Sequence, residues 1–436
     1  MANHFLWGAA TSSHQVEGHN DKNDWWAWES QGNVEGGVRS GAATDHRHRF
    51  KEDLRLAAEL GLNSYRFSVE WSRIEPEEGK WDPEAIEWYR ELIAECERLG
   101  LAPMLTLHHF TCPLWLAEKG GFAWDGAPER FLHFVRKIVA ELGARVPLWC
   151  TINEPAVLVV GSYLARIMPP ARFSKEEASS ACRNLLRAHV LAYDAIHEGV
   201  SSLSERAGPW RERKLQVGLA HNMLDFRADR WWDPRERVLA RLIGDFYNRS
   251  WLEAVTGGRQ RFGVPGILPA PAEVSEARGR RTVDFIGVNY YTKAYIQWRR
   301  NRPSLGIATP LPVQIAFARP REVQSDLGWA IHPEGFGRVL RLAGTYGLPI
   351  YVTENGIADK EDAHRAEYLR LHIKELEKVK AEGVDIQGYY HWSLLDNFEW
   401  VKGFGPRFGL YSVDYETFER RARESALAYR KIITNS

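Results

Sequence analysis

Eight short apolar runs alternate along the chain with longer segments whose apolar residues recur at helical spacing. The runs are short and rich in β-branched and aromatic residues, which is typical of parallel strands buried on both faces. The predicted strands are residues 5–10, 63–69, 103–109, 148–152, 215–220, 283–289, 350–353 and 385–390. The predicted helices are residues 45–60, 83–99, 129–143, 174–197, 234–255, 333–346, 360–382 and 416–433.

Three segments lack a clear period and are predicted to be loops. Residues 19–44 are rich in Gly, Asn and Asp, and residues 298–330 are rich in Pro and Arg. Residues 393–416 are loop-like and aromatic. The loop of residues 19–44 has a length that is usually functional.

Regular alternation of strands and helices predicts an α/β fold with a parallel sheet. An open doubly wound sheet usually carries a Gly-rich phosphate-binding turn after its first strand. No such turn follows residues 5–10. We therefore predict a single (β/α)₈ TIM barrel domain over residues 1–436, with long loops at the carboxyl ends of its strands.

Polar or aromatic residues able to bind a ligand stand at or near the ends of almost all the predicted strands. Parallel strands of a barrel bring their carboxyl ends to one rim, where the chemistry of such folds is found. The sequence therefore predicts a binding or catalytic site at this rim. The residues are Gln15, Arg66, His109, Asn153, Glu154, His221, Asn222, Asn289, Tyr291, Glu354 and Trp392.

Two of these residues are carboxylates in similar contexts. Glu354 ends an apolar strand just before Gly356, and Glu154 ends another just before Pro155. They are 354 − 154 = 200 residues apart, which suits two strand ends brought to the same rim of one sheet or barrel. Two carboxylates suit glycosidic bond cleavage, in which one is a protonated acid and the other stays ionised. Arg66 and Tyr291 are candidates to hold an ionised Glu354, although Arg66 could instead form a structural ion pair.

Composition narrows the range of partners. The chain has 57 basic and 57 acidic residues, so a polyanion such as nucleic acid is not expected. Its 18 Trp residues include flat apolar surfaces on which the C–H face of a sugar ring can stack. Most of them must nonetheless serve the core.

Nothing in the sequence points to a metal, a cofactor or a membrane. His108 and His109 are adjacent in a strand and point to opposite faces, so they cannot ligate one ion. The four cysteines show no CxxC spacing and are expected to be buried thiols in a reducing compartment. No signal peptide or apolar run of 18 residues is evident. A cytoplasmic protein is therefore expected; the sequence leaves its oligomeric state open.

Several motifs resemble glycoside hydrolase family 1, the β-glucosidase family. Its two signatures are similar to Thr353-Glu354-Asn355-Gly356 and Asn153-Glu154-Pro155. Its opening motif resembles residues 5–12 together with Gln15-Val16-Glu17-Gly18. Further matches are Tyr65-Arg66-Phe67-Ser68, Asn289-Tyr290-Tyr291 and the segment 392–400. The resemblance covers residues 5–415, in order.

The resemblance implies a retaining β-glycosidase that needs no cofactor. Glu354 would be the nucleophile and Glu154 the acid/base, with Arg66, Asn289 and Tyr291 supporting the nucleophile. The residues implied to bind substrate are Gln15, His109, Asn153, Trp392, Glu399, Trp400 and Phe408. The expected partners are small β-glycosides or short β-linked oligosaccharides.

Single residues separate branches of the family. Thioglucosidases carry Gln at the position of Glu154, so an O-glycosidase is favoured. Phospho-glycosidases carry Ser where Glu399 stands, and a carboxylate there would repel phosphate. His109-Phe110-Thr111-Cys112-Pro113 departs from the usual His-Trp-Asp-Leu-Pro. Departures also occur at Met168-Pro169-Pro170-Ala171 and at Gly403-Phe404, so the aglycone preference stays open.

The expected substrates are terminal non-reducing β-D-glucosyl residues, with β-galactosides and β-fucosides as further candidates. A specificity mainly for galactosides or fucosides, or transglycosylation at the same site, would use the same two glutamates. A sugar-binding protein without catalysis is the alternative from a different class.

Overall fold

The computed structural model describes residues 5–203, 206–263, 268–298 and 313–435. Its centre is a closed barrel of parallel strands in the order β1-β11-β10-β7-β5-β4-β3-β2. The barrel strands are β1 (Leu6–Ala10), β2 (Ser64–Ser68), β3 (Ala102–His108), β4 (Leu148–Asn153), β5 (Gln216–Asn222), β7 (Phe285–Tyr290), β10 (Ile350–Asn355) and β11 (Ile386–Trp392). The predicted fold class is confirmed, and all eight predicted strands are present.

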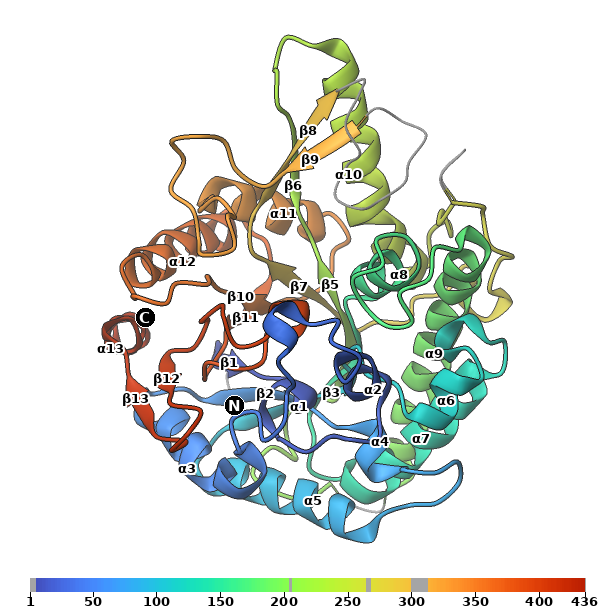
Figure 1. The fold of residues 1–436 in the computed structure, drawn as a ribbon. Helices are drawn as coiled ribbons and strands as arrows, with labels where there is room; N and C mark the ends of the chain where they lie inside the picture. Colours follow the sequence, from blue (N-terminus) through green and yellow to red (C-terminus); the bar gives the residue numbers. More distant parts are fainter. Residues whose placement is uncertain (1–4, 204–205, 264–267, 299–312, 436) are drawn as a thin grey trace.

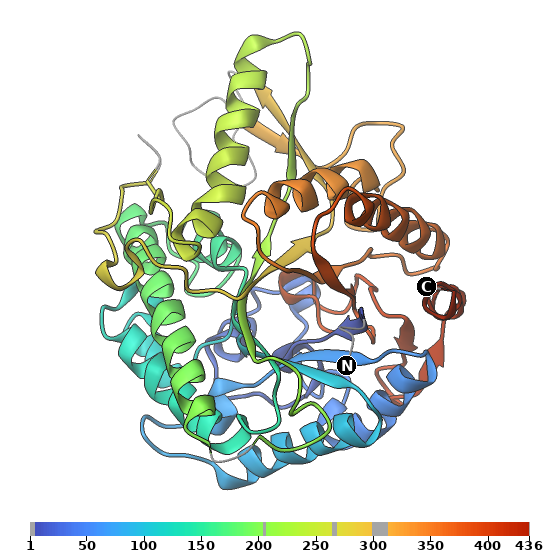
Figure 2. The same cartoon turned by 180° about the vertical axis from the view of Figure 1, so that it is seen from behind.

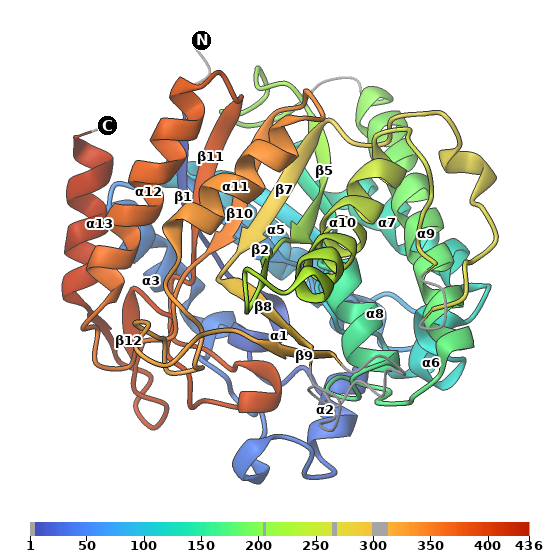
Figure 3. The same ribbon diagram turned by 90° about the horizontal axis from the view of Figure 1, so that it is seen from above.

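Helices surround the barrel (Figures 1 and 2). The long ones are α3 (His46–Glu59), α5 (Pro83–Arg98), α7 (Ala127–Leu142), α8 (Pro155–Tyr163), α9 (Lys175–Ser201), α10 (Pro234–Val255), α11 (Pro333–Gly344), α12 (Arg365–Ala381) and α13 (Glu424–Thr434). Shorter ones are α1 (Ser13–Val16), α2 (Asp24–Glu29), α4 (Trp71–Ile74), α6 (Leu114–Glu118), η1 (Glu35–Gly37), η2 (Gly121–Ala123), η3 (Ser275–Ala277) and η4 (Trp400–Lys402). In the side view, α1, α2, β8 and β9 gather at one end of the barrel (Figure 3).

Alternate residues of each strand pack on the two sides of the barrel wall. In β10, Tyr351 packs inside the barrel with Phe285 and Tyr390. Ile350 and Val352 pack outside, in the larger core under the helices. The apolar runs that predicted the strands are therefore needed on both faces.

The three predicted loops contain regular structure that the sequence analysis missed. Residues 19–44 contain α2, whose N-cap Asn23 accepts a hydrogen bond from the Trp26 amide. Six residues are too few to show a helical period. Residues 411–422 form a hairpin of β12 (Tyr411–Val413) and β13 (Arg420–Ala422). The last helix consequently begins at Glu424, not at residue 416.

Another boundary was placed too early. Helix α12 begins at Arg365, not at residue 360. Asp359 accepts hydrogen bonds from the backbone amides of His364 and Arg365, so its carboxylate satisfies donors of the first turn.

The predicted loop 298–330 is partly a strand. Strand β9 (Val313–Ala316) pairs antiparallel with β8 (Lys293–Trp298), which pairs in parallel with β6 (Asp225–Ala228). Together with α10, this small sheet stands beside the barrel (Figure 1). The pairing is between distant segments, so no local pattern reveals it. Residues 299–312, which were included in the predicted loop, lie outside the described residues.

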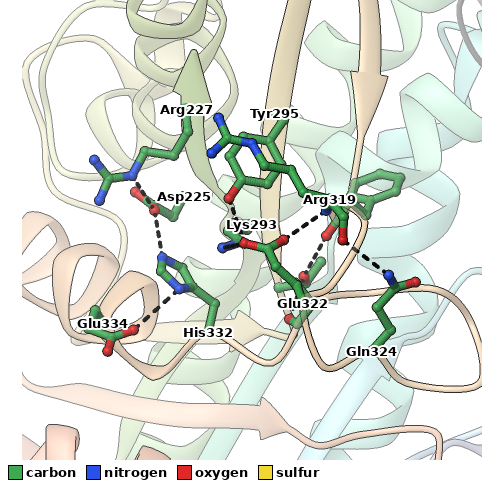
Figure 4. Close-up of polar contacts among 12 residues, drawn as sticks. Asp225, Arg227, Lys293, Tyr295, Arg319, Glu322, Gln324, His332 and Glu334 are labelled. Carbon is green, nitrogen blue, oxygen red and sulfur yellow. Dashed lines mark hydrogen bonds and ion pairs between the residues drawn. The ribbon is translucent and has the colours of Figure 1, made fainter. Parts of the chain in front are cut away.

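A polar cluster holds the segment after β9 against this sheet (Figure 4). Glu322 Oε1 accepts hydrogen bonds from Lys293 Nζ at 2.7 Å and from the Tyr295 hydroxyl at 2.8 Å. Its Oε2 accepts one from the Arg319 amide at 2.8 Å. The Arg319 guanidinium also lies 4.1 Å from the centre of the Tyr295 ring. One carboxylate thus joins strand β8 to the segment that leads to Trp329.

The predicted buried thiols are confirmed: Cys96, Cys112, Cys150 and Cys182 are free and buried. In the described part of the chain, no helix is long and apolar enough to cross a membrane.

Gly356 follows β10 because its neighbours leave no room for a side chain. A Cβ built there would lie 1.9 Å from the carbonyl oxygen of Trp392, at the end of the adjacent strand β11. The contact is with backbone, which cannot rotate away as a side chain can. A larger residue must therefore push apart two strand ends that carry site residues.

We expect Gly356→Ala to destabilise the fold by about 1–3 kcal/mol or more, as overpacking does. Urea unfolding would show a lower midpoint at unchanged slope. Gly405→Ala is the matched control, because the nearest atom to its Cβ is a carbonyl oxygen at 3.5 Å. Equal midpoints for the two variants would contradict this account.

Candidate active site

Both strands that carry a candidate carboxylate contain one extra residue just before it. Against β7, Val352 pairs with Val288 and Glu354 with Asn289, so Thr353 has no partner. Against β5, Cys150 pairs with Gly218 and Asn153 with Ala220, which leaves one residue more on β4. Such bulges shift the side-chain alternation by one residue. The shift allows Glu354 to point into the barrel, the same side as Tyr351.

The backbone of Glu154 is also unusual. It has φ 47° and ψ 58°, a left-handed conformation that is uncommon for a residue other than glycine. Its amide donates to the Ala220 carbonyl, and Pro155 begins α8 directly after it. A strained residue of this kind persists only where its surroundings hold it, and it is found most often at functional sites.

Arg66 links the strands at the centre of the site. Its Nη1 donates to Glu354 Oε1 at 2.6 Å and to the Thr353 carbonyl at 3.1 Å. Its Nη2 donates to Asn153 Oδ1 at 2.7 Å. Burial opposes the charge of the guanidinium, but the Glu354 carboxylate raises the pKa of Arg66 above its usual value. The ion pair that was considered as an alternative is thus present, within the site itself.

Tyr291 provides the second contact to Glu354. Its hydroxyl donates to Oε2 at 2.6 Å. Loss of hydration and the charge of Glu354 raise the pKa of Tyr291 well above its ordinary range, so the hydroxyl keeps its proton and remains a donor. Both oxygens of Glu354 therefore accept hydrogen bonds that favour the ionised carboxylate.

Glu154 has the opposite environment. Its Oε1 accepts hydrogen bonds from Asn289 Nδ2 at 2.8 Å and from Asn222 Nδ2 at 3.1 Å. Burial, with the charge of Glu354 as a second cause, raises the pKa of Glu154 to about 8 despite these donors and Arg66. At neutral pH one carboxyl is thus protonated while the other is held by a guanidinium. An acid and an ionised base can act side by side in such a site.

Hydrogen bonds determine the tautomer of His109. Asn153 Oδ1 accepts from Arg66 and Asn289, so its Nδ2 donates to His109 Nε2 at 3.1 Å. Nδ1 must then carry the proton, and this buried atom has no partner among the described residues. His109 therefore offers one free donor. His108 contacts Phe122 and Phe131, so the two histidines face different sides of the wall, as predicted.

Two tryptophans lie beside His109. The rings of Trp392 and Trp400 stack on it at centroid distances of 6.0 Å and 6.1 Å. Trp400 also contacts Phe110, one of the departures from the family motif, at 5.3 Å. The indole of Trp392 donates to Glu399 Oε1 at 3.2 Å.

Glu399 and Gln15 add polar groups to the same region. Loss of hydration raises the pKa of Glu399 to about 8; the Trp392 bond opposes this rise and the charge of Glu354 adds to it. Gln15 is fully buried, and its Nε2 donates to Asn397 Oδ1 and to the Phe398 carbonyl. Because both its donor hydrogens are used, Gln15 can offer a ligand only its carbonyl oxygen.

The structure brings the predicted residues to one end of the barrel, with one exception. His221 Nε2 bonds the Tyr247 carbonyl of α10, so this ring points to the helices. Phe408 is buried and packs against Tyr291 at 5.9 Å. Trp329 also contacts Tyr291 at 5.9 Å but was not predicted, because it lies in a segment that has no strand-end signal.

Among the described residues, no group of three or more His, Cys, Asp or Glu side chains could hold a metal ion.

Comparisons with known proteins identify the family. The sequence model of glycosyl hydrolase family 1 matches residues 1–436. A β-galactosidase from Pyrococcus woesei is 32% identical, over 99% of this chain and 96% of the relative.

Two solved structures are similar over more than nine-tenths of both chains. A β-glycosidase from Pyrococcus horikoshii is 39% identical with a TM-score of 0.85, covering 98% of this chain and 93% of that one. The β-glucosidase from Thermotoga maritima in complex with noeuromycin is 30% identical with a TM-score of 0.88, covering 100% and 98%. The chain therefore belongs to glycosyl hydrolase family 1.

Proposed function

We propose that this glycoside hydrolase is a retaining β-glucosidase, with Glu354 as nucleophile and Glu154 as acid/base. The observation that carries the proposal is the opposite environment of the two carboxyls. Glu354 accepts from Arg66 and Tyr291, whereas burial raises the pKa of Glu154 to about 8. A nucleophile held by two donors and an acid that keeps its proton are what the two roles require.

The reaction proceeds in two displacements. Glu354 attacks the anomeric carbon while Glu154 gives its proton to the glycosidic oxygen, so the C–O bond breaks and the aglycone leaves as an alcohol. The sugar remains as an ester on Glu354. Glu154, now ionised, takes a proton from water, whose oxygen attacks the anomeric carbon and releases Glu354.

The same region would bind the glycone. His109 Nδ1 would donate a hydrogen bond to the sugar, and the carbonyl oxygen of Gln15 would accept one. Glu399 would form hydrogen bonds with two sugar hydroxyls. Trp392 forms the stacking surface, with Trp400 and Phe408 beside it. Asn289 and Asn153 link Glu154 to Arg66, which in turn holds Glu354, and Asn153 would also bind the glycone. No cofactor takes part in this scheme.

β-Galactosidase or β-fucosidase activity at the same site is the second candidate. It is favoured by the name of the Pyrococcus woesei relative. Glucose and galactose differ at one hydroxyl, which Gln15 and Glu399 would both contact. A panel of aryl glycosides ranks these activities, and product analysis at high acceptor concentration measures transglycosylation.

We further propose that residues 1–436 form one domain. We also propose that the protein is cytoplasmic, and its four free buried cysteines support this location.

Stereochemistry tests the proposal first. A retaining enzyme holds its two carboxyl groups roughly 5–5.5 Å apart, against about 6.5–9.5 Å in an inverting one. We expect the shorter separation between Glu154 and Glu354, and the β-anomer as the first product. Proton NMR in the first minutes of hydrolysis distinguishes the anomers. An initial α-anomer would exclude the double displacement.

The pH profile tests the role of Glu154. Its raised pKa means that the acid is protonated below about pH 8 and loses its proton above. We therefore expect kcat/KM for cellobiose to fall as pH rises through about 8. A dinitrophenyl glucoside needs no proton on its leaving group, so its kcat/KM should lack this limb. If both substrates show the limb, it belongs to another group such as Glu399.

Azide rescue separates the two glutamates. Glu154→Ala should still react with a dinitrophenyl glucoside but lose about 10²–10⁴-fold on cellobiose, as loss of general acid catalysis predicts. Added azide should restore its turnover and give the β-glycosyl azide. Glu354→Ala should fail on both substrates when no azide is present. With added azide it should give the α-glycosyl azide, because azide attacks the anomeric carbon directly. Mass spectrometry and NMR identify the azide product and its anomeric configuration. If Glu154→Ala gave the α-azide and Glu354→Ala the β-azide, the roles of the two glutamates would be exchanged.

A further inference from the structure

The carboxyl of Glu154 has one occupied oxygen and one open oxygen. Oε1 receives amide hydrogens from Asn289 and Asn222. No described group donates to Oε2. A carboxyl oxygen has two lone pairs, and both on Oε1 are used. The acidic proton of Glu154 must then sit on Oε2.

This arrangement depends on how the two amides are oriented. An asparagine turned by 180° would present its carbonyl to Glu154 in place of its NH₂ group. Asn289 is held twice, because Thr353 Oγ1 donates to its Oδ1 at 2.6 Å and its Nδ2 also donates to Asn153 Oδ1. Its orientation would survive the loss of either contact.

Asn222 is held by one contact. The hydroxyl of Tyr247 donates to its Oδ1 at 2.8 Å, and no other described group contacts this oxygen. Tyr247 lies on α10, and its ring packs against Phe226 at 5.6 Å and His221 at 6.1 Å. Its backbone carbonyl is bonded by His221 Nε2. Helix α10 and strand β5 thus hold Tyr247 in place.

We propose that Tyr247 is a positioning residue which, through Asn222, directs the proton of Glu154 to Oε2. The proposal rests on the assignment of Glu154 as the acid. Tyr247 itself does not touch the reacting atoms. Its hydroxyl keeps the Asn222 amide as a donor, so that the other oxygen of Glu154 carries the proton that the glycosidic oxygen receives.

Other groups around Glu154 also affect its pKa, and a substitution at Tyr247 leaves them unchanged. Glu354 on β10 disfavours the ionised form of Glu154, and Arg66 on β2 favours it. Tyr291 carries no charge, because its pKa is raised by burial and by both carboxylates. On the α10 side, burial and the charge of Glu154 likewise raise the pKa of Tyr247, and burial lowers the pKa of His221 to about 4.

Removing the hydroxyl should have two effects. In Tyr247→Phe the amide of Asn222 is free to turn, and its carbonyl then accepts the proton of Glu154 from Oε1. The ionised carboxylate also loses a donor. We expect the basic limb of kcat/KM for cellobiose to move up by about one pH unit. At pH 6, kcat/KM for cellobiose should fall about ten-fold, while that for a dinitrophenyl glucoside stays within about two-fold.

A double-mutant cycle shows whether Tyr247 acts through Asn222. Asn222→Ala should move the limb in the same direction, and Tyr247→Phe should add nothing in that background. Tyr193→Phe is the matched control, since it loses one tyrosine hydrogen bond, to Asp284 at 3.1 Å, and neither of these residues is among the described hydrogen-bond partners of Glu154 or Asn222. Thermal unfolding should show all variants folded.

The possible results are distinct. A limb that does not move in Tyr247→Phe, or that moves equally with and without Asn222, overturns the proposal. So does an equal loss on both substrates, which is the sign of a structural defect. If Glu154→Ala keeps full activity on cellobiose, the acid assignment fails and this inference fails with it. If Glu154 behaves as the acid and only the Tyr247 results are negative, the inference alone is wrong.

Discussion

The site depends on one buried cation placed among several carboxyls. Among the described residues at this end of the barrel, Arg66 alone brings a positive charge to Glu354. Glu154 and Glu399 lie close enough for the negative charge of Glu354 to raise the pKa of each. Isolated charges are costly to bury. One guanidinium compensates one carboxylate, so the remaining two hold protons near neutral pH. The division of labour between acid and nucleophile follows from this imbalance.

The barrel makes that imbalance possible because it is rigid and closed. Arg66 on β2 contacts groups on β4 and β10, strands that lie apart in the barrel order. No short segment could hold a guanidinium between two elements so distant in sequence. The paired strands also fix the backbone position from which each side chain extends. The hydrogen bonds of 2.6–3.1 Å in the site can therefore form without any rearrangement of the backbone.

Elements outside the barrel complete the surroundings of the site. The sheet of β6, β8 and β9 is tied by Glu322 to the segment that brings Trp329 to Tyr291. Helix α10 supplies Tyr247, whose hydroxyl orients Asn222 beside Glu154. These segments follow or flank barrel strands, so variation in them can alter substrate preference while the two glutamates stay in place.

The sequence by itself determined the eight strands, most of the helices, the barrel and the two glutamates. Those features rest on local patterns: apolar runs, helical spacing and short motifs such as Asn153-Glu154-Pro155. Strict alternation from Tyr351, however, would turn Glu354 outward; only the extra residue at Thr353, visible in the pairing with β7, turns it inward. The hairpin before α13, the β6-β8-β9 sheet and the contact from Tyr247 to Asn222 were likewise decided by tertiary structure. The hairpin strands have only three residues each, too few to show a period. The β6–β8 pairing and the Tyr247–Asn222 contact join segments that are apart in the chain, so their energies come from tertiary contacts that no local pattern reveals.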